Sequence, residues 1–241
     1  MAPSSCPFAS GHNIPSSSYD TFIKSLDSLL MVLRQADESQ VKVIVGSQPN
    51  RKTYCIYRCL LCHDSSYFRK ALSGESKEAH ERTITLDQDS VETFKAVHLW
   101  LHTRRIYQSE SGDPNAVPLQ FEGLFKIYFF ADMKGMPALK NAAVDAVFTK
   151  YLQNLEYPAR SVPLVYENTS QDCTLRRVLV DLAVRNYGCQ RLIQEHRTNL
   201  VNDFLVECIM AMRALRGRLD VQPKGWIESV NRCQYHDHSD P

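Results

Sequence analysis

The strand-like patterns of this chain all lie before residue 87, and the pattern after that point is helical. Val41 to Val45 alternates β-branched residues with Lys42 and stops at Gly46. Thr53 to Tyr57 predicts a second strand after a turn at 47–50, and Thr83 to Leu86 a third. A sheet this small must be covered by helices, so we predict an α+β fold with a three-stranded sheet.

Helices are predicted from apolar residues at three- and four-residue spacing. They are expected at 19–36, at 59–72 with Gly74 as the closing residue, after a cap at Asp89 or Ser90, at 119–133, at 137–154, and at roughly 172–187, 190–213 and 224–231. Residues 75–82 are predicted as a charged loop and 109–118 as a polar insertion. A Ser- and Pro-rich disordered tail is expected over 1–18.

Within the helix predicted at 172–187, Leu175, Leu179 and Leu182 form a stripe that we expect to pack against the N-terminal domain. Thr169 is predicted to start this helix in a capping box with Asp172. Arg176 and Arg177 lie away from the stripe and are interpreted as a solvated face.

Composition excludes several classes of function. The 28 basic and 27 acidic side chains give a net charge of +1, which provides no bulk attraction for nucleic acid or an acidic membrane. The N-terminus lacks the basic and apolar regions of a signal peptide, and no apolar run is long enough to span a bilayer. We therefore expect an intracellular protein of the nucleus or cytoplasm, with eight reduced cysteines.

Five blocks in order resemble the BTB/POZ domain. They are VKVIVG from Val41, KTYCIYRCLLCHDSSYFRKALSG up to Gly74, Lys77-Glu78-Ala79 with Ile84-Thr85-Leu86, FKAVHLWLHTRRI from Phe94, and LFKIYFFADMKGM from Leu124 followed by PALKN. The resemblance covers about residues 22–155. Val165 to Asp181 further resembles the C-terminal part of small BTB proteins that are common in filamentous fungi.

Three positions depart from the family pattern. Gln40 stands where the family usually has Asp before the first strand, and Tyr57-Arg58 replaces His-Lys at the end of the second. His102-Thr103-Arg104 replaces Tyr-Thr-Gly. The missing Asp puts in doubt the charged pocket that some BTB dimers use to recruit partners, whereas the fold should not depend on it.

The resemblance implies a homodimer. Phe22, Leu26, Leu29, Leu30 and Leu33 share one face of the helix predicted at 19–36, and burying such a stripe is worth several kcal/mol at roughly 25 cal/mol per Å². These residues form part of a self-complementary interface, or the helix folds back on its own domain, and both alternatives stay open.

The resemblance also implies a partner-binding loop. BTB adaptors of ubiquitin ligases often carry a hydrophobic residue, any residue and then Glu after the second helix, and contact a cullin scaffold there. Ser76, Lys77 and Glu78 occupy these positions, so Glu78 is present but the hydrophobic anchor is not. Since a buried anchor usually dominates such a contact, we predict weak cullin binding, and a solvated charged loop is the favoured interpretation.

Two clusters carry the residue types that bind metal ions: Cys55, Cys59, Cys62 and His63, and Cys233, His236 and His238. Neither has the paired knuckles of a zinc site, so buried core thiols and an unstructured polar end are the preferred interpretations. No nucleophile elbow, phosphate-binding glycine loop or His-Glu-x-x-His pattern is present. We therefore predict no enzyme and no cofactor, with a small metal-binding or catalytic protein as the alternative.

The sequence thus predicts a disordered tail at 1–18, a BTB/POZ domain at 19–155, a helical extension at 156–230 and a polar tail at 231–241. Its expected function is an adaptor or scaffold that binds itself and other proteins. A cullin or transcriptional regulators are the candidate partners, and no nucleic acid or membrane is expected.

Overall fold

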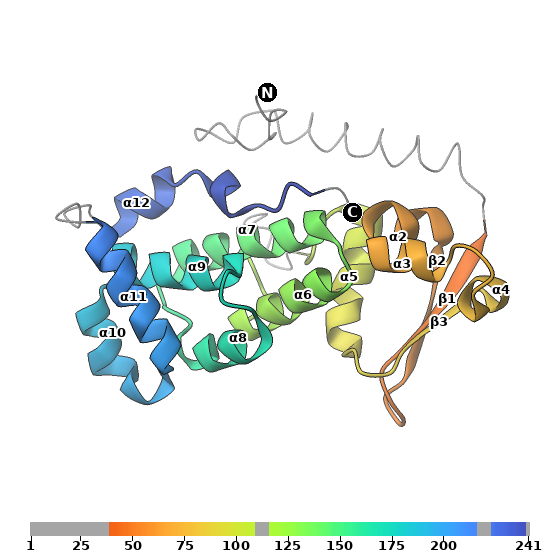
Figure 1. Cartoon of the computed structure of the whole chain (residues 1–241), viewed down its shortest axis with the longest axis horizontal. Helices are drawn as coiled ribbons and strands as arrows, with labels where there is room; N and C mark the ends of the chain where they lie inside the picture. Colours follow the sequence, from red (N-terminus) through yellow and green to blue (C-terminus); the bar gives the residue numbers. More distant parts are fainter. Residues whose placement is uncertain (1–38, 109–115, 216–222, 240–241) are drawn as a thin grey trace. The chain divides into compact units, whose positions relative to one another are not determined.

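The computed structural model describes residues 39–108, 116–215 and 223–239 (Figure 1). The chain divides into two compact units. Among the described residues, the sheet unit comprises 39–108, 126–142 and 237–239, and the helical unit comprises 116–125, 143–215 and 223–236. The tail predicted at 1–18 and the helix predicted at 19–36 lie outside the described residues.

The three predicted strands form one mixed sheet with β1 (Gln40–Val45) in the centre. β2 (Lys52–Tyr57) pairs with β1 antiparallel, with Val43 opposite Tyr54, and β3 (Thr83–Leu86) pairs with it parallel, with Val43 opposite Ile84. Alternate residues of every strand are buried. The α+β prediction and the three-stranded sheet are confirmed.

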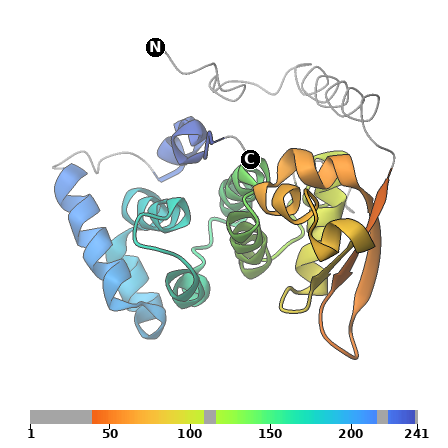
Figure 2. The ribbon, with the colours of Figure 1, turned by 45° about the vertical axis from the view of Figure 1, so that its right-hand side comes forward.

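Helices cover one face of the sheet. Figure 2 shows α2 (Arg58–Asp64), α3 (Ser66–Ala71) and α5 (Val91–Thr103) on the same side of the strands. The predicted cap of α5 is Ser90, whose hydroxyl accepts from the Thr93 amide at 3.3 Å. Within this layer the Phe94 ring packs against Tyr54 and Phe130, with centroids 4.9 and 5.8 Å apart.

Two details of the region after β2 differ from the prediction. The single helix expected at 59–72 is two helices, because Ser65 has an extended backbone between them. The expected charged loop contains a short helix, α4 (Lys77–Glu81). Helix α3 ends at Ala71, so Gly74, with φ +76°, lies in the following turn rather than at the cap.

Two longer helices follow as predicted: α6 (Phe121–Met133) and α7 (Pro137–Asn154), separated by a turn at Gly135. Both pass from one unit to the other in sequence. Their buried side chains include Leu124, Phe125 and Tyr128 of α6.

The helical unit is more finely divided than the sequence pattern predicts. It contains the 3₁₀ turn η1 (Ala159–Ser161), α8 (Val162–Asn168), α9 (Thr174–Leu182), the π turn η2 (Ala183–Tyr187), α10 (Cys189–His196), the 3₁₀ turn η3 (Arg197–Asn199), α11 (Asn202–Leu215), α12 (Pro223–Ser229) and the 3₁₀ turn η4 (Arg232–Tyr235). The helix expected at 190–213 is therefore α10 and α11. Leu175, Leu179 and Leu182 are fully buried within this unit.

The predicted capping box is wrong. Thr169 follows the last residue of α8, and its hydroxyl donates to the Val165 carbonyl at 2.6 Å, while α9 begins four residues beyond Ser170. A β-branched hydroxyl can bond backwards to the preceding turn, so the same residue type that starts helices also ends them.

The solvated interpretation of Arg176 is also wrong. Arg176 is buried, its guanidinium donates to the carbonyls of Tyr166 and Thr169, and it lies 3.7 Å from the Glu207 carboxylate. Arg177 is exposed, as predicted. Adjacent helical residues point about a quarter-turn apart, so one can be buried while the next is exposed.

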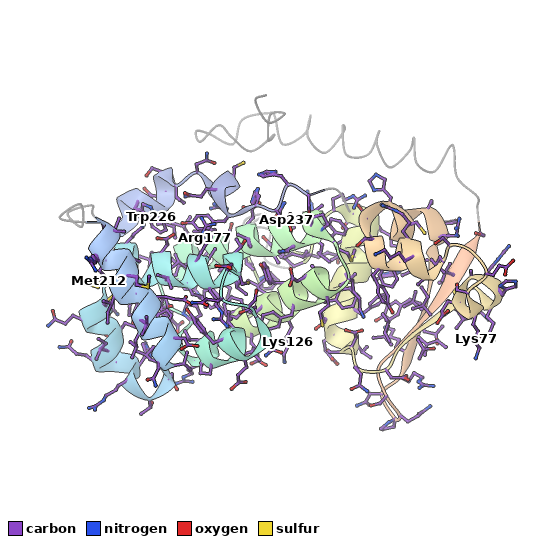
Figure 3. The ribbon with its side chains drawn as sticks, in the orientation of Figure 1. Lys77, Lys126, Arg177, Met212, Trp226 and Asp237 are labelled. Atoms are coloured by element: carbon purple, nitrogen blue, oxygen red, sulfur yellow. The ribbon has the colours of Figure 1, made fainter. Side chains whose placement is uncertain are left out.

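Residues 231–239 are not an unstructured end. Tyr235 is buried, its ring lies 5.2 Å from that of Phe148, and its hydroxyl donates to Asp181 at 2.6 Å. In the sheet unit, the backbone of Asp237 exchanges two hydrogen bonds with the Asn141 side chain. Figure 3 labels Asp237. The polar composition of this segment predicts a solvated end, but its polar groups bind charged and amide partners in place of water.

Candidate protein-interaction site

The start of α3 is attached to the turn between α6 and α7. The buried Ser65 hydroxyl donates to the Lys134 carbonyl at 2.5 Å and accepts from the Phe68 amide at 3.1 Å. The Ser66 amide donates to the Gly135 carbonyl at 3.1 Å. These bonds explain why the chain breaks at Ser65, since the serine side chain caps α3 at the Phe68 amide and binds the Lys134 carbonyl from the following turn.

Gly135 is required in this turn. Its φ is +57°, and a Cβ there would lie 2.1 Å from the Ser66 hydroxyl oxygen. Glycine adopts positive φ without the penalty that other residues incur. The close approach of Gly135 to α3 therefore depends on the missing side chain.

Lys134 fixes an aromatic residue on the same surface. Its ammonium lies 3.3 Å from the Asp89 carboxylate and 4.5 Å from the ring centroid of Tyr67. Tyr67 is 37% exposed, so its free side faces solvent. A half-exposed aromatic ring held by a cation is a suitable contact for another protein.

Ser76 is the N-cap of α4 and uses both functions of its hydroxyl. The oxygen accepts from the Ala79 amide at 3.1 Å, and the hydroxyl donates to the Ala71 carbonyl at 2.7 Å. Ser76 therefore joins the end of α3 to the start of α4. The residue has a structural role and does not offer a side chain to a partner.

The two neighbours of Ser76 face outward. Lys77 and Glu78 are exposed, and Figure 3 labels Lys77 on α4. The Lys77 ammonium lies 3.8 Å from Glu81 one turn later. Within the part of the chain that the structure describes, Glu78 makes no ion pair, so its carboxylate is available to a partner on a short, capped helix.

The family model for the BTB/POZ domain matches residues 30–133, which include β1 and the end of α6. Residues 30–133 therefore form a BTB/POZ domain. BTB/POZ domains are protein–protein interaction modules that mediate self-association and binding to other proteins. No curated protein matches the chain. The helices α2, α3 and α4 lie within the matched segment. The match confirms the family resemblance of the sequence.

The structure accounts for two departures from the BTB/POZ pattern near the strands. Gln40 is an exposed residue at the start of β1, opposite Tyr57. Arg58, at the second position of the usual His-Lys pair, donates to the Leu72 carbonyl at 2.9 Å and so satisfies the end of α3. Neither substitution disturbs the sheet.

The third departure places Arg104 where BTB/POZ domains usually have glycine. Arg104 ends α5 with φ +59°, a left-handed conformation that suits glycine. Its guanidinium donates to the nearly buried Asp64 carboxylate at 2.7 Å and lies 4.5 Å from the Trp100 ring centroid. His63 contacts the other Asp64 oxygen at 3.0 Å. The arginine accepts an unfavourable backbone and gains a charged partner.

The predicted dimer residues lie outside the described part of the chain. They are Phe22, Leu26, Leu29, Leu30 and Leu33. Their role stays a prediction.

The cysteines of the sheet unit are less buried than expected. Cys55 is exposed, while Cys59 and Cys62 are half-buried, so the interpretation as core thiols is wrong for Cys55. Burial raises the pKa of the Cys62 thiol, which keeps it protonated. Among the described residues, no group of three Cys, His, Asp or Glu side chains is placed to hold a metal ion.

The second Cys and His cluster does not converge on one point. The His236 side chain is buried, and its Nε2 lies 3.1 Å from the Asp145 carboxylate. Cys233 is half-buried in η4, where its amide donates to the Asn231 side chain at 3.0 Å. These residues fasten the end of the chain to its helical unit.

A small pocket of about 110 Å³ lies in the sheet unit beside Gly135 and Pro137. Its charged lining is already paired: the Lys140 ammonium lies 2.7 Å from Asp132 and 3.0 Å from Asp237. The two carboxylates hold the pKa of Lys140 above its usual value despite the opposing effect of burial. Such a pocket offers a partner no free charge.

Within the described residues, every helix is too short or too polar to cross a membrane.

Proposed function

We propose that this protein is a homodimeric BTB scaffold that acts in the nucleus or cytoplasm and joins a second protein to a regulatory complex. Its BTB domain spans about 19–155, and a helical extension spans about 156–230. The observation that carries the proposal is an apolar stripe that runs into the start of the matched BTB/POZ segment, residues 30–133. It consists of Phe22, Leu26, Leu29, Leu30 and Leu33. A helix with such a stripe is stable only where another surface covers it.

The second protein contacts the surface of α3 and α4. Tyr67, Lys77 and Glu78 are its exposed side chains, and the bonds of Ser65 and Ser76 hold both helices in place. A preformed surface lowers the entropy cost of association. The complex serves ubiquitin ligation or transcriptional regulation, and the two roles differ in the protein that this surface selects.

Dimerisation is tested by sedimentation of the full chain with Leu29→Asp, with Ser28→Asp as the matched control on the opposite side of the predicted helix. We expect Leu29→Asp to lower the mass of the sedimenting species from dimer toward monomer and Ser28→Asp to leave it unchanged. Only the first substitution places a charge in the apolar stripe. Equal masses for both variants and the unchanged chain would contradict this interface.

Cullin binding is tested with Ser76→Met, which restores a hydrophobic anchor. We expect the unchanged chain to bind a cullin N-terminal domain weakly and Ser76→Met to bind more tightly, with Ser73→Met as the control nearby. Loss of the α4 cap costs about 1 kcal/mol, which a well-buried methionine exceeds. Tight binding by the unchanged chain that disappears in Glu78→Gln would show that no anchor is needed.

A further inference from the structure

Helix α11 exposes an apolar stripe that its own unit does not cover. Val206, Ile209 and Met210 are 54%, 65% and 66% exposed, and their spacing places them on one side of the helix. Four of the eight large hydrophobic side chains that are exposed among the described residues belong to α11, Met212 (labelled in Figure 3) being the fourth. Such a concentration marks an interaction surface.

The opposite side of α11 already makes the core contacts of the helix. Phe204 and Cys208 are buried there, and the Phe204 ring lies 6.3 and 5.9 Å from the rings of Tyr157 and Tyr166. With about 100° between successive residues, Phe204 and Cys208 lie roughly half a turn away from the Val206 side. The exposed stripe is thus a second apolar face, which the fold of the unit does not require.

A charge stands at each end of this stripe. Asp203 precedes it and Arg213 follows it, and both side chains are exposed. In the part of the chain that the structure describes, neither residue forms an ion pair. Ten residues of helix separate the two charges by about 15 Å.

The arrangement is complementary to itself when reversed. If two α11 helices lie antiparallel about a two-fold axis level with residue 208, Asp203 of one copy lies level with Arg213 of the other. Val206 then lies level with Met210, and the two Ile209 side chains flank the axis. Both charges gain an opposite partner, and the apolar residues between them are covered.

We propose that α11 is a self-association surface that binds α11 of a second copy of this chain in antiparallel orientation. A membrane surface fits less well, because a helix that lies on lipid usually carries several basic residues and this stripe has only Arg213. One helix face is small against the roughly 800 Å² per partner of a standard interface, so the contact is weak by itself. Linkage to the proposed BTB dimer would strengthen it.

Charge exchange tests the orientation. The experiment uses sedimentation of the full chain over a concentration series, in a Leu29→Asp background that removes the dimer contact proposed above. The variants are Asp203→Arg, Arg213→Asp, the double exchange, and an equimolar mixture of the two single variants. Both substituted positions of α11, 203 and 213, are exposed, and circular dichroism checks the fold.

We expect the Leu29→Asp chain to form a concentration-dependent dimer. Each single exchange turns two attractions into two repulsions, so the dissociation constant should rise by about ten-fold. The double exchange restores both pairs within one kind of chain, and the mixture restores them between two kinds. Both should recover the original dissociation constant.

A Leu29→Asp chain that stays monomeric at every concentration would overturn this inference, as would a dimer that single exchanges leave unchanged or that the double exchange fails to recover. The BTB interface has its own readout. If Leu29→Asp has no effect on the mass while Asp203→Arg dissociates the dimer, the BTB interface fails and the α11 surface stands.

Discussion

Arg104 and Asp64 show how one side chain can compensate for an unfavourable backbone. The left-handed position at the end of α5 suits glycine, yet arginine occupies it and binds a carboxylate that is almost fully buried. The sequence revealed that the family's glycine is missing, but it could not reveal the reason, because Asp64 lies 40 residues earlier. Long-range pairs of this kind have no local signature.

We predict that Arg104→Gly destabilises the protein although it relieves the backbone. Relief of the backbone by glycine should raise the free energy of unfolding by about 1 kcal/mol. Loss of the arginine partner of buried Asp64 should lower it by about 2 to 3 kcal/mol. The free energy of unfolding in urea measures the difference. Asp64→Asn combined with Arg104→Gly should lose less than Arg104→Gly alone, and an equal or greater loss would show that the ion pair is not the stabilising contact.

The turn between α6 and α7 depends on the missing side chain of Gly135. Gly135→Ala should lower the free energy of unfolding by about 1 to 2 kcal/mol, because φ is positive and Ser66 occupies the space. Gly123→Ala is the matched control within helix α6, where a Cβ meets nothing within 4 Å, and it should be neutral or stabilising. Equal losses in both variants would remove the special role of the turn.

At the scale of elements, the strands and long helices followed from local patterns, whereas the short helices did not. The break at Ser65 depends on the Lys134 carbonyl, and α4 depends on a hydroxyl bound to Ala71. The apolar residues of 59–72 fit one helix or two equally well. Helices of fewer than two turns form through tertiary contacts, which a periodicity does not contain.

Arg176 joins three helices, because it lies on α9 and contacts Tyr166 of α8 and Glu207 of α11. It also contacts Thr169, which directly follows α8. We predict that Arg176→Ala lowers the free energy of unfolding by about 2 to 4 kcal/mol, since two carbonyls and a carboxylate lose their donor. Arg177→Ala, at the exposed neighbouring position, should change it by less than about 0.5 kcal/mol. Similar effects of the two variants, measured by urea unfolding, would restore the solvated interpretation of Arg176.

At the scale of the whole molecule, the sequence predicted the fold class, the sheet and the family through the order of several weak blocks. It did not predict the exposed face of α11, because apolar residues at helical spacing look the same whether they face a core or solvent. Val206 and Phe204 are both apolar, and only the structure separates them. The sequence pattern was therefore enough to predict the fold, whereas the exposed face of α11 could be recognised only from the burial of its side chains.

We propose that copies of this chain bind one another through the segment before β1. Native mass spectrometry of two co-expressed copies with tags of different mass tests it most directly. We expect mixed dimers in statistical proportion from the unchanged chain and from Ser28→Asp, and a marked loss of mixed dimers with Leu29→Asp. Spectra that contain only the two separate monomers, or mixed dimers that Leu29→Asp leaves undiminished, would contradict it.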